Sequence, residues 1–155
     1  MGSTLQFAIG NKTKIISAVE KEDFDFFEML EAESKIADFS IHINAKDLIL
    51  LINSATELKG NNPLNFRANL DTSNFYFDTE DRGAYFVDPI IQILFSKFLR
   101  TDAIIITTKW FEKMSKEYSE DLEVTEEAIS AVEQLIAICQ ESQSKNLDLV
   151  HIWFL

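Results

Sequence analysis

At 155 residues, the chain is long enough to bury a hydrophobic core without disulfides or a structural metal. Its 26 acidic residues outnumber the 14 basic ones and give a formal net charge of −12, which repels nucleic acid and anionic membranes alike. A basic protein partner suits this charge, although acidity that only keeps a cytoplasmic protein soluble explains it as well. The four Gly and two Pro are too few for the tight turns of an all-β sandwich, so helices should form much of the chain.

The chain opens with a pattern of one strand and two helices. Apolar residues alternate with polar or small ones over residues 4–9, which predicts a half-buried strand. Asn11 is placed to cap a helix that begins at residue 12, and Asp23 is placed to cap a second helix. The second helix should bury its Phe and Leu residues and turn its carboxylates to water.

The order of strand, cap and helix returns after the second helix. Alternation over residues 39–43 predicts a strand. Asn44 and Asp47 then predict a capped helix that ends at Gly60.

Residues 64–88 have the least regular pattern, and irregular exposed segments often carry function. Aromatic runs at 75–77 and 84–87 predict two short strands that are joined by a polar hairpin loop. Asp88 and Pro89 then predict the start of a helix over residues 90–99, which is apolar nearly all round and should therefore be deeply buried.

Residues 103–106 are mostly β-branched, which predicts a short buried strand followed by a helix capped at Thr107 or Thr108. A helix that runs straight through from Asp102 is the alternative. Thr125 should cap a long amphipathic helix that ends near Lys145.

The last residues, 147–155, form an apolar run, and such a run is typical of an inner strand that is covered on both faces. Together the elements predict one domain over residues 1–155, of the α/β or α+β class. We expect a mixed sheet of about five strands with packed helices, and with the C-terminal strand near the sheet centre.

No motif in the chain fixes a chemistry. The glycines are isolated, so dinucleotide and phosphate-binding loops have no support. A calcium loop is excluded because Arg82 and Pro89 stand where oxygen ligands are needed. Cys139 lies on the apolar face of its helix, where a thiol behaves as a small hydrophobic group. We expect no metal and no cofactor.

The two histidines, His42 and His151, both fall on predicted strands. If those strands are adjacent, the imidazoles and a carboxylate such as Asp47 or Asp148 form a metal or acid/base site. The alternative is that each imidazole makes a structural hydrogen bond, and the lack of a ligand spacing such as His-x-x-x-His favours it. An enzyme is therefore the less favoured hypothesis.

Two groups of residues suit a binding surface. The acidic helix that carries Glu22, Asp25 and Glu28 matches a basic partner, although a solvated helix face is the commoner explanation. In the hairpin, exposed Tyr76 and Tyr85 together with Arg82 would form an interface hot spot; core packing under a covering helix is the alternative.

The stretch from Ile129 through Cys139 to residues 148–153 resembles the end of the uncharacterised bacterial YfbM-like domain family. In that family, a long amphipathic helix precedes an apolar strand that ends in Trp. The strand and helix over residues 5–19 are similar too, whereas residues 46–51 lack the Trp and His that the family carries there. The family has no assigned reaction, so the resemblance implies a size and a fold class.

The favoured hypothesis is a non-enzymatic cytoplasmic binding protein, of which an acidic immunity or antitoxin-type protein that binds a basic partner is the concrete version. Two alternatives stay open. One is a small enzyme or metal site that uses His42 or His151, and the other is a structural domain that self-associates through the aromatic hairpin. The opening residues lack the charged region and apolar core of a signal peptide, which favours the cytoplasm.

Overall fold

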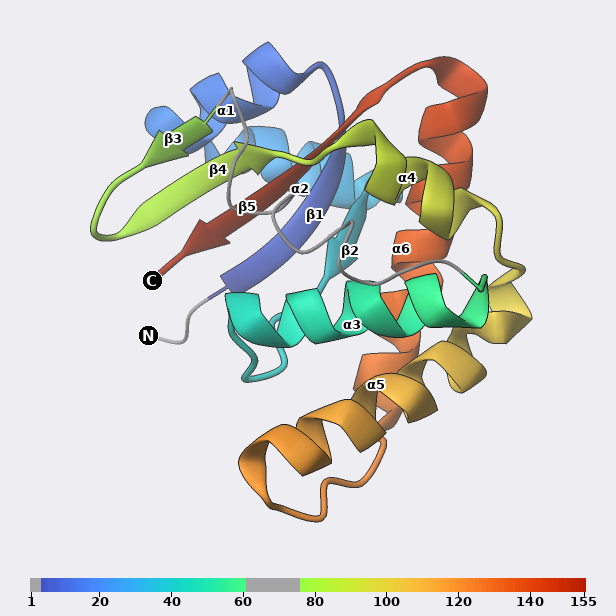
Figure 1. Cartoon of the computed structure of the whole chain (residues 1–155). Helices are drawn as coiled ribbons and strands as arrows, with labels where there is room; N and C mark the ends of the chain where they lie inside the picture. Colours follow the sequence, from blue (N-terminus) through green and yellow to red (C-terminus); the bar gives the residue numbers. More distant parts are fainter. Residues whose placement is uncertain (1–3, 61–75) are drawn as a thin grey trace.

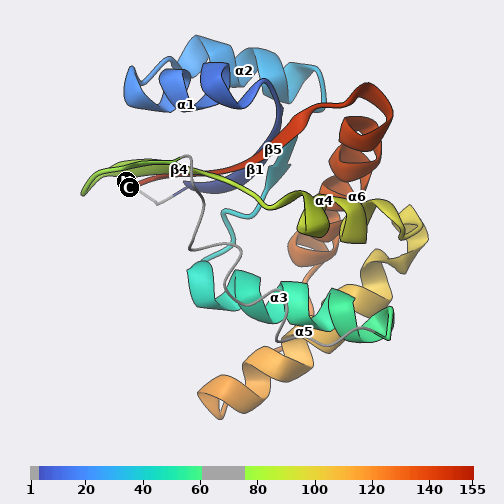
Figure 2. The ribbon, with the colours of Figure 1, turned by 45° about the horizontal axis from the view of Figure 1, so that its top comes forward.

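A five-stranded sheet runs through the middle of the molecule, with helices on both of its faces (Figure 1; Figure 2). The computed structural model describes residues 4–60 and 76–155. The strands are β1 (Thr4–Gly10), β2 (Ile36–Asp38), β3 (Tyr76–Asp78), β4 (Arg82–Phe86) and β5 (Asp148–Phe154). Their order across the sheet is β2-β1-β5-β4-β3, and each of the four pairings is antiparallel.

The described residues also form six α-helices and a short 3-10 turn, η2 (Arg100–Asp102). The helices are α1 (Lys12–Glu20), α2 (Phe24–Ala32), α3 (Ala45–Leu58), α4 (Pro89–Ser96), α5 (Ala103–Tyr118) and α6 (Glu126–Lys145). Figure 2 shows α1 and α2 above one face of the sheet, while α3, α4, α5 and α6 lie on the other side. No helix in these residues has the length and apolar character needed to cross a membrane.

The predicted fold class, the expected number of about five strands and the central position of the C-terminal strand are confirmed. The sheet itself is antiparallel in all described pairings, where we expected a mixed one. In β5, Leu149 belongs to the core that the α3–α6 layer covers, whereas Val150 and Ile152 belong to the core under α1 and α2. Its apolar run is continuous because both faces are covered.

Every predicted N-cap that lies outside the 103–106 region is confirmed. The capping side chain accepts a hydrogen bond from a backbone N–H in the first turn of α1, α2, α3, α4 and α6 in turn. The caps are Asn11, Asp23, Asn44, Asp88 and Thr125. Each cap is worth about 1 kcal/mol, so together they determine where the helices begin.

The strand predicted over residues 39–43 is wrong, because β2 ends at Asp38. The Asp38 carboxylate accepts a hydrogen bond from the Ser40 N–H, and the Ser40 hydroxyl accepts one from the Leu5 N–H. These side chains replace the backbone ladder and turn the chain away from β1. His42 then lies in a bend with a left-handed φ of 61°.

The strand predicted over residues 103–106 is also wrong, and the alternative helix is present as α5. The Asp102 carboxylate accepts from the Leu99 N–H just before the helix, at 2.8 Å. The Thr107 hydroxyl donates to the Ala103 carbonyl inside the helix, so it does not cap anything. Ile104 is 58% exposed, which is why the apolar run gave a misleading signal.

The helix predicted over residues 90–99 ends earlier, at Ser96, and is not buried all round. Ile91, Leu94 and Phe95 enter the core, but Ile90 is 51% exposed and Ile93 is 39% exposed. The position of α4 at the edge of its layer leaves one apolar face uncovered among the described residues.

The predicted hairpin is formed by β3 and β4, with Asp78 in register with Gly83. Gly83 in turn lies opposite Trp153 of β5. The indole ring covers this glycine so closely that a Cβ added there would lie 2.4 Å from the Trp153 Nε1 atom. The first residue of the predicted 75–77 strand lies outside the described residues.

Gly83→Ala should lower the free energy of unfolding by about 1–3 kcal/mol, because the added methyl group overpacks the indole ring. Urea unfolding followed by circular dichroism measures the loss. In a Trp153→Ala background the same substitution should cost much less, since the ring that it meets is gone. Equal costs in the two backgrounds would contradict the proposed clash.

Deletion of residues 151–155 should leave the chain unfolded, because it removes most of the strand that joins β1 to β4. Deletion of Leu155 alone is the control, since that side chain is 64% exposed and follows the strand. Thermal unfolding by circular dichroism tests both. A cooperative transition in the longer truncation would show that β5 is dispensable.

Candidate functional site

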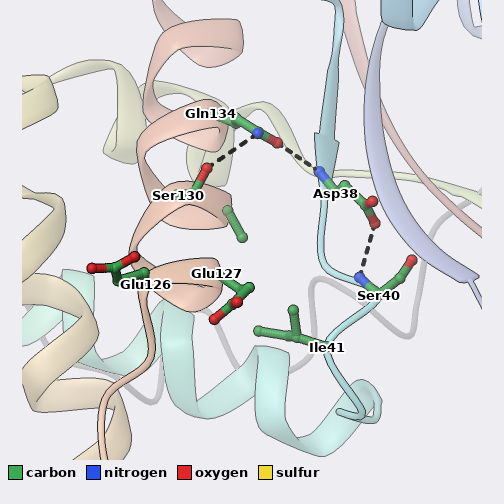
Figure 3. Close-up of a pocket in the computed structure, with 8 residues that line it drawn as sticks. Asp38, Ser40, Ile41, Glu126, Glu127, Ser130 and Gln134 are labelled. Atoms are coloured by element: carbon green, nitrogen blue, oxygen red, sulfur yellow. Dashed lines mark hydrogen bonds between the residues drawn. The ribbon is translucent and has the colours of Figure 1, made fainter.

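A pocket of about 460 Å³ opens between the end of β2 and the first turns of α6 (Figure 3). Its lining contains three carboxylates, two hydroxyls and one amide. The residues are Asp38, Ser40, Ile41, Glu126, Glu127, Ser130, Ala131 and Gln134.

The pocket walls are joined by hydrogen bonds that also protect the edge of the sheet. The Gln134 Oε1 atom accepts from the Asp38 N–H at 3.0 Å, so a side chain of α6 satisfies a donor on the edge strand β2. The Gln134 Nε2 atom donates to the Ser130 hydroxyl at 3.4 Å. Asp38 in turn accepts from the Ser40 N–H at 2.9 Å. The side chains of Gln134 and Asp38 are therefore held in place before any ligand arrives.

Glu126 and Glu127 occupy the first turn of α6, where the helix dipole favours negative charge. Figure 3 shows Glu127 on the side of α6 that faces Ile41, whereas the Glu126 carboxylate points to the opposite side of the helix. Asp38 lies across the pocket from α6. Within residues 4–60 and 76–155, none of these three carboxylates forms an ion pair.

The described residues of this site offer hydrogen-bond acceptors to a ligand and no cation. Carboxylate and hydroxyl oxygens around a recess suit a guanidinium or an ammonium group. In the part of the chain that the structure describes, no three His, Cys, Asp or Glu side chains are placed to hold a metal ion.

Arg82, a predicted hot-spot residue, is bound inside the molecule. Its guanidinium donates to the carbonyls of Val19 and Glu20, each at 3.0 Å, and pairs with Glu22 at 3.0 Å. These carbonyls lie in the last turn of α1, and the Val19 carbonyl also accepts a hydrogen bond from the Glu22 N–H at 3.2 Å. Arg82 therefore attaches the hairpin to α1, and Glu22 shares in that contact.

Tyr85, another predicted hot-spot residue, does not share a surface with Arg82. Tyr85 is in register with His151 and stacks on its ring at 6.3 Å between centroids. Arg82 is three positions away on the same strand, so its side chain points to the opposite face of the sheet. The side chain of Tyr76 lies outside the described residues.

Asp25 and Glu28 lie on α2 and are exposed there. Neither forms an ion pair within the described residues. They are flanked by two exposed apolar side chains, Phe24 at 54% and Met29 at 47%.

The structure does not bring the two histidines together, because β1 separates β2 from β5 and His42 is exposed beyond the end of β2. His151 is buried between the rings of Phe7 and Tyr85. The candidate carboxylates are occupied elsewhere: Asp148 accepts from the Lys12 N–H, and Asp47 from the Tyr118 hydroxyl. A shared acid/base or metal site at these histidines therefore has no geometric support.

Cys139 is completely buried on α6, and burial raises the pKa of its thiol well above the usual range. The thiol therefore stays protonated and uncharged at neutral pH. The expectation that this residue acts as a small hydrophobic group agrees with its position.

The sequence contained one signal for the pocket that the predictions did not use. Glu127, Ser130 and Gln134 stand at positions i, i+3 and i+7 and so form a polar stripe on one face of their helix. The other wall of the pocket comes from Asp38, and only the packing of α6 against β2 brings it there.

No protein-family profile, curated protein or solved structure matches this chain. The resemblance to the YfbM-like domain family therefore stays a prediction.

His151 should make the protein sensitive to acid. Burial lowers its pKa from 6.5 to about 4, and its buried Nε2 atom has no hydrogen-bond partner among the described residues. Because the unfolded chain binds the proton more tightly, the contribution of His151 to stability is complete above pH 6.5. It is lost as the pH falls from 6.5 to about 4, by up to about 3 kcal/mol.

Urea unfolding of His151→Leu across this pH range should show a weaker dependence of stability on pH than the unchanged chain. At pH 7 the variant should be about as stable, since the substitution removes an unsatisfied buried atom. His42→Asn is the control, because His42 is exposed and Asn tolerates its left-handed backbone. The same pH dependence in all three proteins would exclude His151 as the source.

Proposed function

We propose that this chain is a non-enzymatic binding protein for a basic protein partner, and that an arginine side chain of the partner enters the pocket between β2 and α6. The observation that supports it is the position of Asp38 and Glu127 on opposite walls of this pocket, with no cation from the described residues between them. A partner that brings the missing positive charge completes the site.

Arginine suits the pocket better than lysine for a geometric reason. Its planar guanidinium presents several N–H donors at once, and the pocket has acceptors on two walls. Hydrogen bonds between ionised groups are stronger than neutral ones. Gln134 already joins the two walls, so little conformational entropy is lost when the guanidinium enters.

The net charge of the whole molecule favours the same class of partner, because it acts at long range. At −12, the molecule attracts a basic protein over the range of a Debye length and raises the rate of encounter. The free carboxylates Asp25 and Glu28 add to this field.

The concrete version of the proposal is an acidic immunity or antitoxin-type protein that binds and blocks a basic toxin in the cytoplasm. Such a protein works by binding alone, so it needs no nucleophile and no acid/base pair. The buried, protonated thiol of Cys139 suits a reducing compartment.

The test uses a fluorescein-labelled triarginine peptide and measures its anisotropy at low salt. Glu127→Gln should weaken binding about tenfold, because one charge-assisted interaction is lost. Glu123→Gln is the matched control. It removes the same charge from an exposed residue just before α6 that does not line the pocket, and should change the affinity little.

An equal effect of the two substitutions would mean that only the overall charge attracts the peptide, and the pocket proposal would fail. A trilysine peptide should bind more weakly than triarginine if the guanidinium geometry matters. If the immobilised chain retains no basic protein from a mixture at low salt, the wider proposal of a basic partner fails too.

A further inference from the structure

The hairpin of α1 and α2 carries opposite charges on the outer faces of its two helices. It forms the outermost layer above the sheet, and only residues 21–23 connect the helices (Figure 2). The outer face of α1 presents a lysine stripe, defined as Lys14, Ser17 and Lys21. The outer face of α2 presents a carboxylate stripe, defined as Asp25, Glu28 and Glu31.

The two stripes have matching lengths. Lys14 lies in α1 and Lys21 is its C-cap, seven residues later. This separation corresponds to two helical turns, or about 10 Å along the helix axis. Asp25 and Glu31 are six residues apart on α2, which corresponds to about 9 Å. The charges at the two ends of each stripe are therefore separated by similar distances along their helices.

Neither stripe is neutralised inside the chain. Among the described residues, the two lysines and the three carboxylates form no ion pair, although they belong to neighbouring helices. All five charged side chains are exposed, so they are accessible to an external partner.

A groove of about 380 Å³ runs beside the lysine stripe. Ala18 and Phe26 line it with apolar atoms, and Lys14 and Lys21 border it. On the neighbouring helix, Met29 is 47% exposed. Its unbranched side chain suits an irregular apolar recess of this kind.

We propose that this hairpin docks face to face on the same hairpin of a second copy of the chain. A twofold axis that runs parallel to the helices, between α1 and α2, places α1 of each copy over α2 of the other. Each lysine stripe then meets a carboxylate stripe, and the contact is made twice. An axis across the helices would instead place like charges together, so the charge pattern selects one arrangement.

Two features of the dimer follow from its charges. Each copy has a net charge of −12, and this repulsion opposes association, so the dimer is weak and reversible. The interface uses no residue of the pocket between β2 and α6. The dimer and the binding of a basic partner in that pocket can therefore fail independently.

Charge exchange between two variants tests the dimer. The first variant carries Lys14→Glu and Lys21→Glu, and the second carries Asp25→Lys and Glu28→Lys. Each alone brings like charges together across both contacts, so we expect its association to be at least about tenfold weaker than that of the unchanged chain. Mixed together, they restore both contacts and should form a one-to-one heterodimer.

Sedimentation velocity over a range of protein concentrations measures all of these species, and thermal unfolding by circular dichroism checks that each variant is folded. The control is Lys97→Glu with Lys116→Glu, which changes the net charge equally at exposed positions outside the hairpin and should still dimerise. A monomeric unchanged chain would overturn the proposal. Dimerisation of the first variant alone, or a mixture that does not associate, would overturn it as well.

Discussion

The fold depends on the burial of β5 from both sides. Leu149 faces one core and Val150 the other, and each strand neighbour of β5 is antiparallel to it. A strand covered on two faces requires two helical layers, and the chain supplies them as α1 with α2 and as α3 to α6 (Figure 2). Arg82 of the β3–β4 hairpin then binds the end of α1. The layer of α1 and α2 is therefore attached to the sheet by polar contacts as well as apolar ones.

Signals that depend on a few neighbouring residues were predicted correctly from the sequence. The N-caps and the hairpin belong to this group, because a side chain and a backbone donor two or three residues away suffice to define a cap. The runs at Phe39 and at Ile104 were misassigned for the opposite reason. A short β-branched or alternating run has no local feature that separates a strand from a helix or an extended loop, and the neighbouring elements decide. Strand order depends wholly on such long-range packing.

The candidate site likewise has a part that the sequence predicted and a part that it did not. An acidic face on α2 was predicted, and Asp25 and Glu28 do lie on its surface. The pocket was not predicted, because Asp38 and Glu127 come from distant parts of the chain and meet only when α6 covers the edge of the sheet. Arg82 looked free in the sequence because the carbonyls that it binds, at the end of α1, carry no sequence signature.

The two tryptophans report on different parts of this molecule. Trp110 is fully buried in the α3–α6 layer and donates its indole N–H to the Asp47 carbonyl at 2.8 Å. Trp153 is half-buried on β5 and lies over Gly83. A water-borne quencher such as acrylamide reaches the second ring more readily than the first. The intrinsic fluorescence of this chain thus contains two separable components. Quenching of Trp153 reports on the sheet and quenching of Trp110 on the larger helical layer, without any added label.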